Sequence, residues 1–121
     1  MNTQNQSEIS IGVDVGKANL DIAIYPLDRY FRIPNTREAI QKFLPLLKEL
    51  DVKRIVLEAT GRHEHPFVFA CDQANLPICV VDPVKVRRFA QALGIHAKTD
   101  KIDAVLIARF AATMKPESKV I

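Results

Sequence analysis

The chain has 121 residues, of which 48% are hydrophobic and 26% are charged, and its formal net charge at pH 7 is +3. This length suits one domain with a buried core, and the composition excludes an intrinsically disordered chain. No apolar run approaches the roughly 20 residues that a membrane helix needs, and the polar N-terminus lacks the features of a signal peptide. We therefore expect a cytoplasmic protein without a membrane partner.

The first part of the chain predicts three short strands. Apolar residues alternate along positions 8–16 and again along 19–26, and only a short gap separates the two segments. Alternation with period two is typical of strands, and the short gap predicts a hairpin. Residues 30–34 predict a third strand that continues the meander.

A helix is expected next, because apolar residues between positions 40 and 47 recur at helical spacing. Asn35 or Thr36 stands where a residue can cap the N-terminus of this helix. Pro45 conflicts with the pattern, since proline lacks the N–H that a helix interior requires. We therefore expect the helix to be kinked or broken at Pro45.

Strands and helices alternate in the remainder of the chain. They are predicted as strands at 53–60 and 76–82 and helices at 67–74, 83–93 and 100–114. Asp82 and Pro83 form a helix start and Gly94 a helix stop. The order β-β-β-α-β-α-β-α-α predicts a mixed sheet covered by helices. We expect one domain at 9–115, a disordered lead-in at 1–8 and a tail at 116–121.

Positive charge is concentrated late in the sequence. Residues 52–121 carry eleven Lys and Arg against seven Asp and Glu, whereas residues 1–51 carry six against seven. Within 84–101 the basic residues are Lys85, Arg87, Arg88, Lys98 and Lys101, and the only acidic one is Asp100. Such a cluster is typical of phosphate binding, although charge alone predicts an ordinary solvated helix face equally well. His96 lies in the same basic loop.

Four acidic residues occupy positions where acids are unfavourable. Asp14 lies inside an apolar strand, Glu58 ends an apolar run, and Asp100 and Asp103 begin an apolar helix. The last two share one helix face, because positions i and i+3 differ by about 60°. Carboxylates brought together by two strand ends and a helix start would need a cation. Oxygen ligands of this kind suit Mg²⁺ or Mn²⁺, and paired ions of this type cleave phosphodiesters.

Each acid also has a local explanation. Asp100 could cap the last helix, and Asp103 could interact with the helix dipole. Asp14 could bond its own backbone in a turn, and Glu58 could be an exposed strand end. These explanations leave only the combination of the four acids unexplained.

Three segments carry a resemblance to a known family. The segments are "IGVDVGKANLDIAI", "VLEATG" and "VDPVKVRRFAQALGIHAKTDKIDAVLIARFA", and together they extend over roughly residues 9–114. They resemble the N-terminal domain of the DEDD insertion-sequence transposases, which include the pilin-gene-inverting recombinases. The resemblance implies a ribonuclease-H-like (RuvC-like) fold with helices on both faces of the sheet. It also implies that Asp14, Glu58, Asp100 and Asp103 are the catalytic metal ligands.

The resemblance also implies partners and a missing part. Family members are roughly three times as long, and their C-terminal domain carries a serine thought to attack DNA. We therefore expect a nucleoid-associated bacterial or archaeal protein that binds DNA, and possibly a guide RNA made by the element. In the full-length protein we expect a homo-oligomer, and from this chain alone incomplete recombination activity. The nucleic-acid contacts are assigned to Lys85, Arg87, Arg88, His96, Lys98 and Lys101.

Two other functions remain open on the sequence. The first is a non-catalytic DNA or RNA holder that keeps the acids as a relic. The second is one lobe of a sugar-kinase or actin-like ATPase, because "GVDVGKANLDIAI" resembles the phosphate loop of those proteins. The second alternative leaves "KTDKID" unexplained and lacks another phosphate loop.

Overall fold

A computed structural model of the protein describes residues 8–117. Its strands are β1 (Ser10–Val15), β2 (Asn19–Tyr25), β3 (Arg29–Pro34), β4 (Arg54–Glu58) and β5 (Ile78–Val81). Its helices are α1 (Arg37–Glu49), α2 (His65–Gln73), α3 (Pro83–Leu93) and α4 (Asp100–Met114). The predicted element order is therefore confirmed, with boundaries that differ by a few residues.

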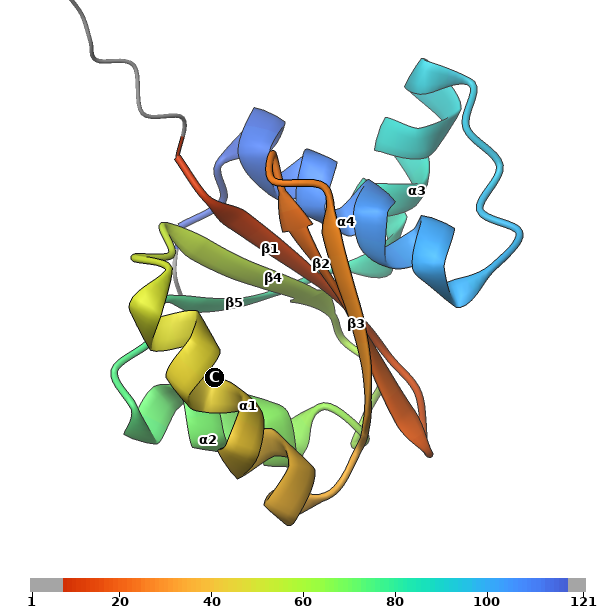
Figure 1. The fold of residues 1–121 in the computed structure, drawn as a ribbon. Coiled ribbons are helices and arrows are strands. Elements are labelled where there is room, and N and C mark those ends of the chain that lie inside the picture. Colours follow the sequence, from red (N-terminus) through yellow and green to blue (C-terminus); the bar gives the residue numbers. More distant parts are fainter. Residues whose placement is uncertain (1–7, 118–121) are drawn as a thin grey trace, which may run out of the picture.

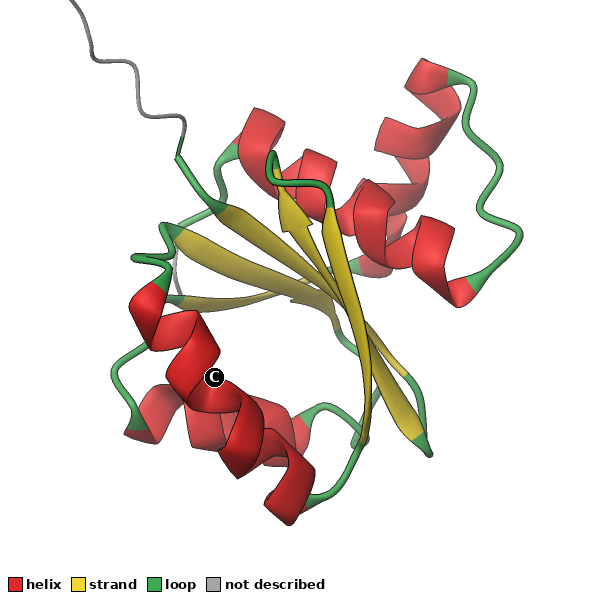
Figure 2. Ribbon diagram, viewed as in Figure 1, coloured by secondary structure: helices red, strands yellow, loops and turns green. Residues whose placement is uncertain are grey.

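The five strands form one mixed sheet in the order β3-β2-β1-β4-β5. β1, β2 and β3 are an antiparallel meander, and β4 and β5 are parallel to β1. Figures 1 and 2 show α1 and α2 on one face of the sheet and α3 and α4 on the other. The expected mixed sheet with helices on both faces is what the chain forms.

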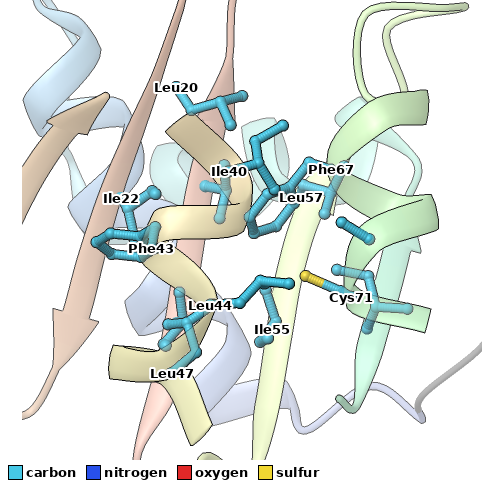
Figure 3. Close-up of a cluster of buried hydrophobic side chains, with 14 of the residues drawn as sticks. Leu20, Ile22, Ile40, Phe43, Leu44, Leu47, Ile55, Leu57, Phe67 and Cys71 are labelled. Atoms are coloured by element: carbon cyan, nitrogen blue, oxygen red, sulfur yellow. The ribbon is translucent and has the colours of Figure 1, made fainter. Parts of the chain in front are cut away.

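The two faces of the sheet are packed differently. Under α1 and α2 lies the larger cluster of buried side chains, including Phe67, Leu47 and Leu57 (Figure 3). On the other face, Val56 and Val81 of the sheet form a second cluster with Leu106 and Phe110 of α4, and a separate small cluster contains only Ala23, Ala104 and Ala108. Large side chains therefore hold helices to both faces, and the alanines let α4 approach the sheet closely at one place.

Helix α1 corrects one expectation and confirms another. Thr36 is its N-cap, and the Thr36 hydroxyl accepts a hydrogen bond from the Ala39 backbone N–H at 3.2 Å. The helix continues through Pro45 to Glu49, so of the two outcomes expected at Pro45, a kink or a break, the break is wrong. Pro45 and Gln41 lie on the exposed side of α1, where the carbonyl that Pro45 leaves unbonded can face water. Buried apolar residues on both sides of Pro45 hold the helix together.

Helix α4 crosses the sheet directly over Gly12 of β1. An added Cβ at Gly12 would lie 2.2 Å from the Ala108 backbone nitrogen and 2.4 Å from the Ala104 carbonyl oxygen. Both atoms belong to helix backbone, so a side chain at position 12 would push α4 off the sheet. Val105 is 37% exposed, so the apolar run of α4 is only partly directed to the sheet.

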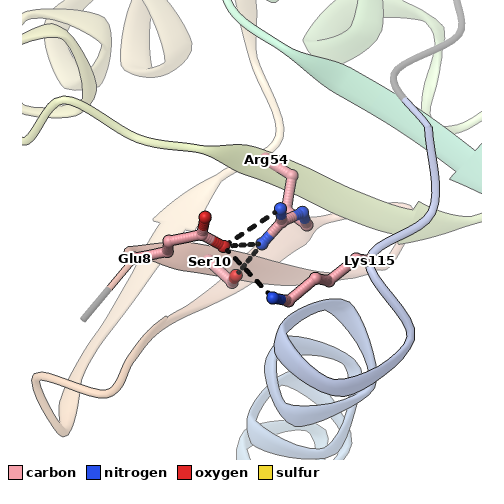
Figure 4. Close-up of polar contacts among 4 residues, drawn as sticks. All are labelled: Glu8, Ser10, Arg54 and Lys115. Carbon is pink, nitrogen blue, oxygen red and sulfur yellow. Dashed lines mark hydrogen bonds and ion pairs between the residues drawn. The ribbon is translucent and has the colours of Figure 1, made fainter.

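Polar contacts connect the C-terminal end of α4 with β1 and β4 (Figure 4). The buried Arg54 guanidinium donates to Ser10 Oγ at 3.0 Å and to Glu8 Oε1 at 3.2 Å. Lys115, just after α4, lies 3.9 Å from the same Glu8 oxygen. Glu8 thus has a structural partner although it falls in the expected lead-in. Residues 1–7 and 118–121, where the rest of the lead-in and most of the tail were expected, lie outside the described residues.

Within residues 8–117, none of the helices has the length and apolar character that crossing a membrane requires.

The close approach at Gly12 generates a stability prediction. We expect Gly12→Ala to lower the free energy of unfolding by roughly 3 kcal/mol, because the added methyl group meets helix backbone that cannot rotate away. Gly16→Ala is the matched control, since its added Cβ would lie 3.2 Å from one carbonyl oxygen and should cost much less. Urea unfolding measures both values. Equal stability of the two variants would contradict the proposed packing role of Gly12.

Candidate functional site

Two of the predicted acids lie at neighbouring strand ends. Asp14 is near the end of β1 and Glu58 is the last residue of β4, and these strands are parallel neighbours. Side chains alternate between faces along a strand. Asp14 therefore shares the face of Gly12, which packs under α4, and Glu58 shares the face of Val56, which packs against α4. Both carboxylates are half-buried.

The N-terminus of α4 brings the other two acids to the same place. Thr99 is the N-cap of α4, with its hydroxyl accepting from the Ile102 backbone N–H at 3.1 Å. The alternative in which Asp100 caps the helix is therefore wrong. Because Thr99 satisfies the helix end, the carboxylates of Asp100 and Asp103 in the first turn are available for other partners.

A fifth acid, Asp21, joins the site and was not predicted. It lies on β2 directly opposite Asp14 in the antiparallel register, and only 2% of it is exposed. Like Asp14, it interrupts an apolar strand, at "LDIAI". That same signal in the sequence could have identified it.

Three carboxylates form the tightest part of the site. Oxygens of Asp14, Asp21 and Asp100 all lie within 4.8 Å of one another. The Tyr30 hydroxyl donates a hydrogen bond to Asp21. Arg32 lies between two acids, with Nε 3.8 Å from Asp21 Oδ1 and Nη2 3.6 Å from Asp100 Oδ2. Tyr30 and Arg32 come from the edge strand β3 and so hold Asp21 from outside the cluster.

Burial and mutual repulsion raise the pKa values of Asp14 and Asp103. Burial, together with the neighbouring charges of Asp103, Asp100 and Asp21, raises the pKa of Asp14 to about 7. Burial, followed by the charge of Asp100, raises the pKa of Asp103. Each effect disfavours the ionised carboxylate. The cluster therefore favours either a proton or a cation.

Glu58 stands at the other end of the row of acids. Its pKa is raised by burial and then by the charge of Asp103, whereas the Arg87 guanidinium acts in the opposite direction. Within residues 8–117, neither Glu58 nor Asp103 belongs to the group whose oxygens lie within 4.8 Å. The four predicted acids thus face one region as a row, with Asp103 between Glu58 and the cluster of Asp14 and Asp100.

The predicted nucleic-acid-binding residues differ in their positions relative to the acids. Arg87 and His96 line a cleft that also contains Glu58 and Asp103. Lys101 lies on the other side, with Nζ 5.2 Å from the centroid of the Tyr30 ring. The other three, Lys85, Arg88 and Lys98, are exposed and do not line that cleft.

Structural comparison identifies the class of fold. Thermus thermophilus RuvC in complex with a Holliday junction substrate superposes with a TM-score of 0.66 at 14% sequence identity, covering 93% of this chain and 99% of that chain. A second structure of RuvC from that organism gives a TM-score of 0.64 with the same identity and coverage. The chain therefore has a RuvC-like, ribonuclease-H-type fold, as the resemblance implied.

Sequence comparison then identifies the family. Residues 11–120 match the transposase family of the DEDD type named for IS110, so the chain belongs to that family. Curated relatives include the pilin gene-inverting proteins of Moraxella lacunata and Moraxella bovis, each 26% identical over 117 residues. These alignments cover 91% of this chain and 36% of each relative. The chain thus spans about a third of the length of those relatives.

The raised pKa of Asp14 predicts how stability depends on pH. An acid whose pKa is higher in the folded than in the unfolded state binds more protons when folded, so its contribution to stability falls as pH rises. For Asp14 this decline runs from near its ordinary pKa of 3.8 to about 7. In the presence of a chelator, the Tm of Asp14→Asn should therefore rise relative to the Tm of the wild type as pH increases across that range. The difference should reach at least about 4 °C near neutral pH. A Tm difference that is constant between pH 4 and 8 would contradict this assignment.

Proposed function

We propose that this chain is the metal-dependent, nuclease-type part of a transposase and acts on phosphodiesters of DNA. Asp14, Glu58, Asp100 and Asp103 would hold Mg²⁺ or Mn²⁺ and would be the catalytic set. The observation that carries the proposal is that carboxylates from separate elements face one region at one end of the sheet. The family assignment supports it, because the family is one of transposases.

The donor set fits a hard divalent ion. All the donors are carboxylate oxygens, which Mg²⁺ and Mn²⁺ prefer. The oxygens of Asp14, Asp21 and Asp100 lie within 4.8 Å of one another, so these three residues would be able to hold one such ion after side-chain rotation.

Charge balance favours two ions. The row of four acids and Asp21 together contain five carboxylates, and the guanidinium groups of Arg32 and Arg87 stand at the two ends. With all groups ionised, about three negative charges remain uncompensated. One divalent ion would leave a negative site that repels a phosphodiester, whereas two would leave a positive one that attracts it.

The side chains of this chain would contribute position and charge. Bound divalent ions would polarise the phosphodiester and activate the attacking oxygen. Thr99 holds the first turn of α4, so Asp100 and Asp103 are presented on a rigid element. Tyr30 and Arg32 keep the Asp21 carboxylate beside Asp14, and this adds negative charge where cations are needed.

The partners belong to the same proposal. DNA is the proposed substrate, held in part by Lys85, Arg87, Arg88, His96, Lys98 and Lys101. A guide RNA, a homo-oligomeric assembly and a location at the nucleoid are what the family resemblance leads us to expect of the full-length protein. Binding through these cations should weaken with salt, by a slope of roughly 0.7–0.9 in log units for each phosphate contacted.

The non-catalytic alternative differs in one measurable property. A holder that keeps the acids only as a relic would bind nucleic acid without binding Mn²⁺ tightly. The nucleotide-binding lobe is less compatible with the transposase family to which the chain belongs. Nucleotide titration tests it directly, since micromolar ATP binding would favour that alternative.

Metal titration tests the proposed site. We expect Mn²⁺ to bind the wild-type chain in calorimetry with about two ions per chain. Asp14→Asn and Asp103→Asn should each weaken this binding at least about tenfold, because each removes a charged oxygen ligand. Asp72→Asn is the matched control, since Asp72 is exposed on α2, on the opposite face of the sheet.

The folded state of each variant is checked by its thermal transition. Wild-type Mn²⁺ affinity in both Asp14→Asn and Asp103→Asn would overturn the ligand assignment. Absence of Mn²⁺ binding in the wild type would favour the non-catalytic holder.

A further inference from the structure

A cleft of about 600 Å³ opens between α3 and α4 beside the row of acids. Its charged end contains Glu58, Asp103 and Arg87, and His96 lies on its rim loop. Its apolar floor is formed by Val86 and Leu106, which are buried, together with Pro83 and Ile95, which are partly exposed. Figure 1 shows the two helices side by side, joined by the loop at residues 94–99.

The orientation of α3 singles out Arg87 among the cations of that helix. Residues that line the cleft follow helical spacing, namely Pro83, Val86, Arg87, Ala90 and Gln91. Lys85 and Arg88 are exposed on the same helix but do not line the cleft. Only Arg87 is therefore placed to act at the acids, and it is close enough to Glu58 to oppose the rise in that residue's pKa.

The lining of the cleft combines three kinds of chemistry. The guanidinium of Arg87 offers paired donors that match a phosphate. Pro83 and Ile95 offer apolar surface, and the Gln91 amide can both donate and accept hydrogen bonds. Phosphate, flat base and base edge are the three corresponding parts of a nucleotide. The volume also falls within the range of small-molecule sites.

We propose that this cleft binds one unpaired nucleotide of the strand that is cleaved, with its phosphate at Arg87 and its base on the apolar floor at Pro83 and Ile95. This inference rests on the proposed function, because the acids define where the phosphate lies. A base inside a duplex is stacked on both faces and paired at its edge, so it cannot lie on the floor. An unpaired base enters at less cost because it has little stacking to lose.

Filling the cleft tests this selectivity. Ala97 is exposed in the 94–99 loop and lines the cleft, so Ala97→Phe should occupy the space of the base without disturbing the core. Ala92→Phe is the matched control, since Ala92 is exposed on α3 and does not line the cleft. Fluorescence anisotropy in Ca²⁺ measures the affinity for a duplex with one unpaired nucleotide, for the same DNA lacking that base, and for a fully paired duplex.

The expected pattern is a loss confined to the unpaired base. Wild type and Ala92→Phe should bind the DNA with the unpaired nucleotide about tenfold more tightly than the DNA lacking that base. Ala97→Phe should abolish this difference and leave affinity for the paired duplex unchanged. Arg87→Gln should reduce the preference for the unpaired substrate, whereas Arg88→Gln should weaken all three DNAs equally. A difference that persists in Ala97→Phe, or that is absent from the wild type, would overturn the inference.

The outcome is separable from that of the proposed function. If the chain binds Mn²⁺ in calorimetry but its DNA affinity does not depend on the unpaired base, only the cleft assignment is contradicted. If DNA affinity depends on the base but the chain does not bind Mn²⁺, only the metal site is contradicted.

Discussion

The contact between α4 and β1 at Gly12 is the constraint on which the rest of the site depends. An added methyl group at Gly12 would collide with backbone atoms of Ala104 and Ala108, so α4 lies too close to the sheet for any side chain at this position. Asp14 follows Gly12 by two residues on the same strand face, and Asp103 precedes Ala104 on the helix. The spacing between the strand acid and the helix acids is therefore set by backbone packing, which varies far less than side-chain conformation.

The site works against the stability of the fold. Five acids at one end of the sheet repel one another, and the pKa of Asp14 rises to about 7 as a result of burial and that repulsion. The buried clusters compensate, because large side chains pack under α1 and α2 (Figure 3) and also under α3 and α4. A functional site whose unfavourable interactions are offset by packing elsewhere is common in proteins.

Much of the fold could be predicted because the responsible signals are local. Alternation identified the strands, Asp82 and Gly94 marked the ends of α3, and both features reflect the backbone conformation of a few residues. Pro45 was misjudged because the rule against proline in helices assumes that the freed carbonyl is costly, whereas here it lies on the exposed side. The outcome depended on which side of the helix faces water, which the packing of the whole domain decides.

The site was less predictable because it depends on strand register and helix rotation. Asp21 is adjacent to Asp14 only through the pairing of β1 with β2, which the sequence does not specify residue by residue. The basic residues of α3 project in different directions for a similar reason. Arg87 and Arg88 are neighbours in sequence, but their positions differ by about 100° around the helix axis. Charge counting detected the cations and could not say which of them faces the acids.

The two ends of the row of acids differ in the surroundings of their arginines. Arg32 from β3 contacts Asp21 and Asp100 at one end, and Arg87 from α3 acts on Glu58 at the other. Arg32 already spans two carboxylates, whereas Arg87 lines an open cleft with an apolar floor. The two ends therefore differ in the space they offer, because the hollow beside Arg32 has about 220 Å³ and the cleft beside Arg87 about 600 Å³.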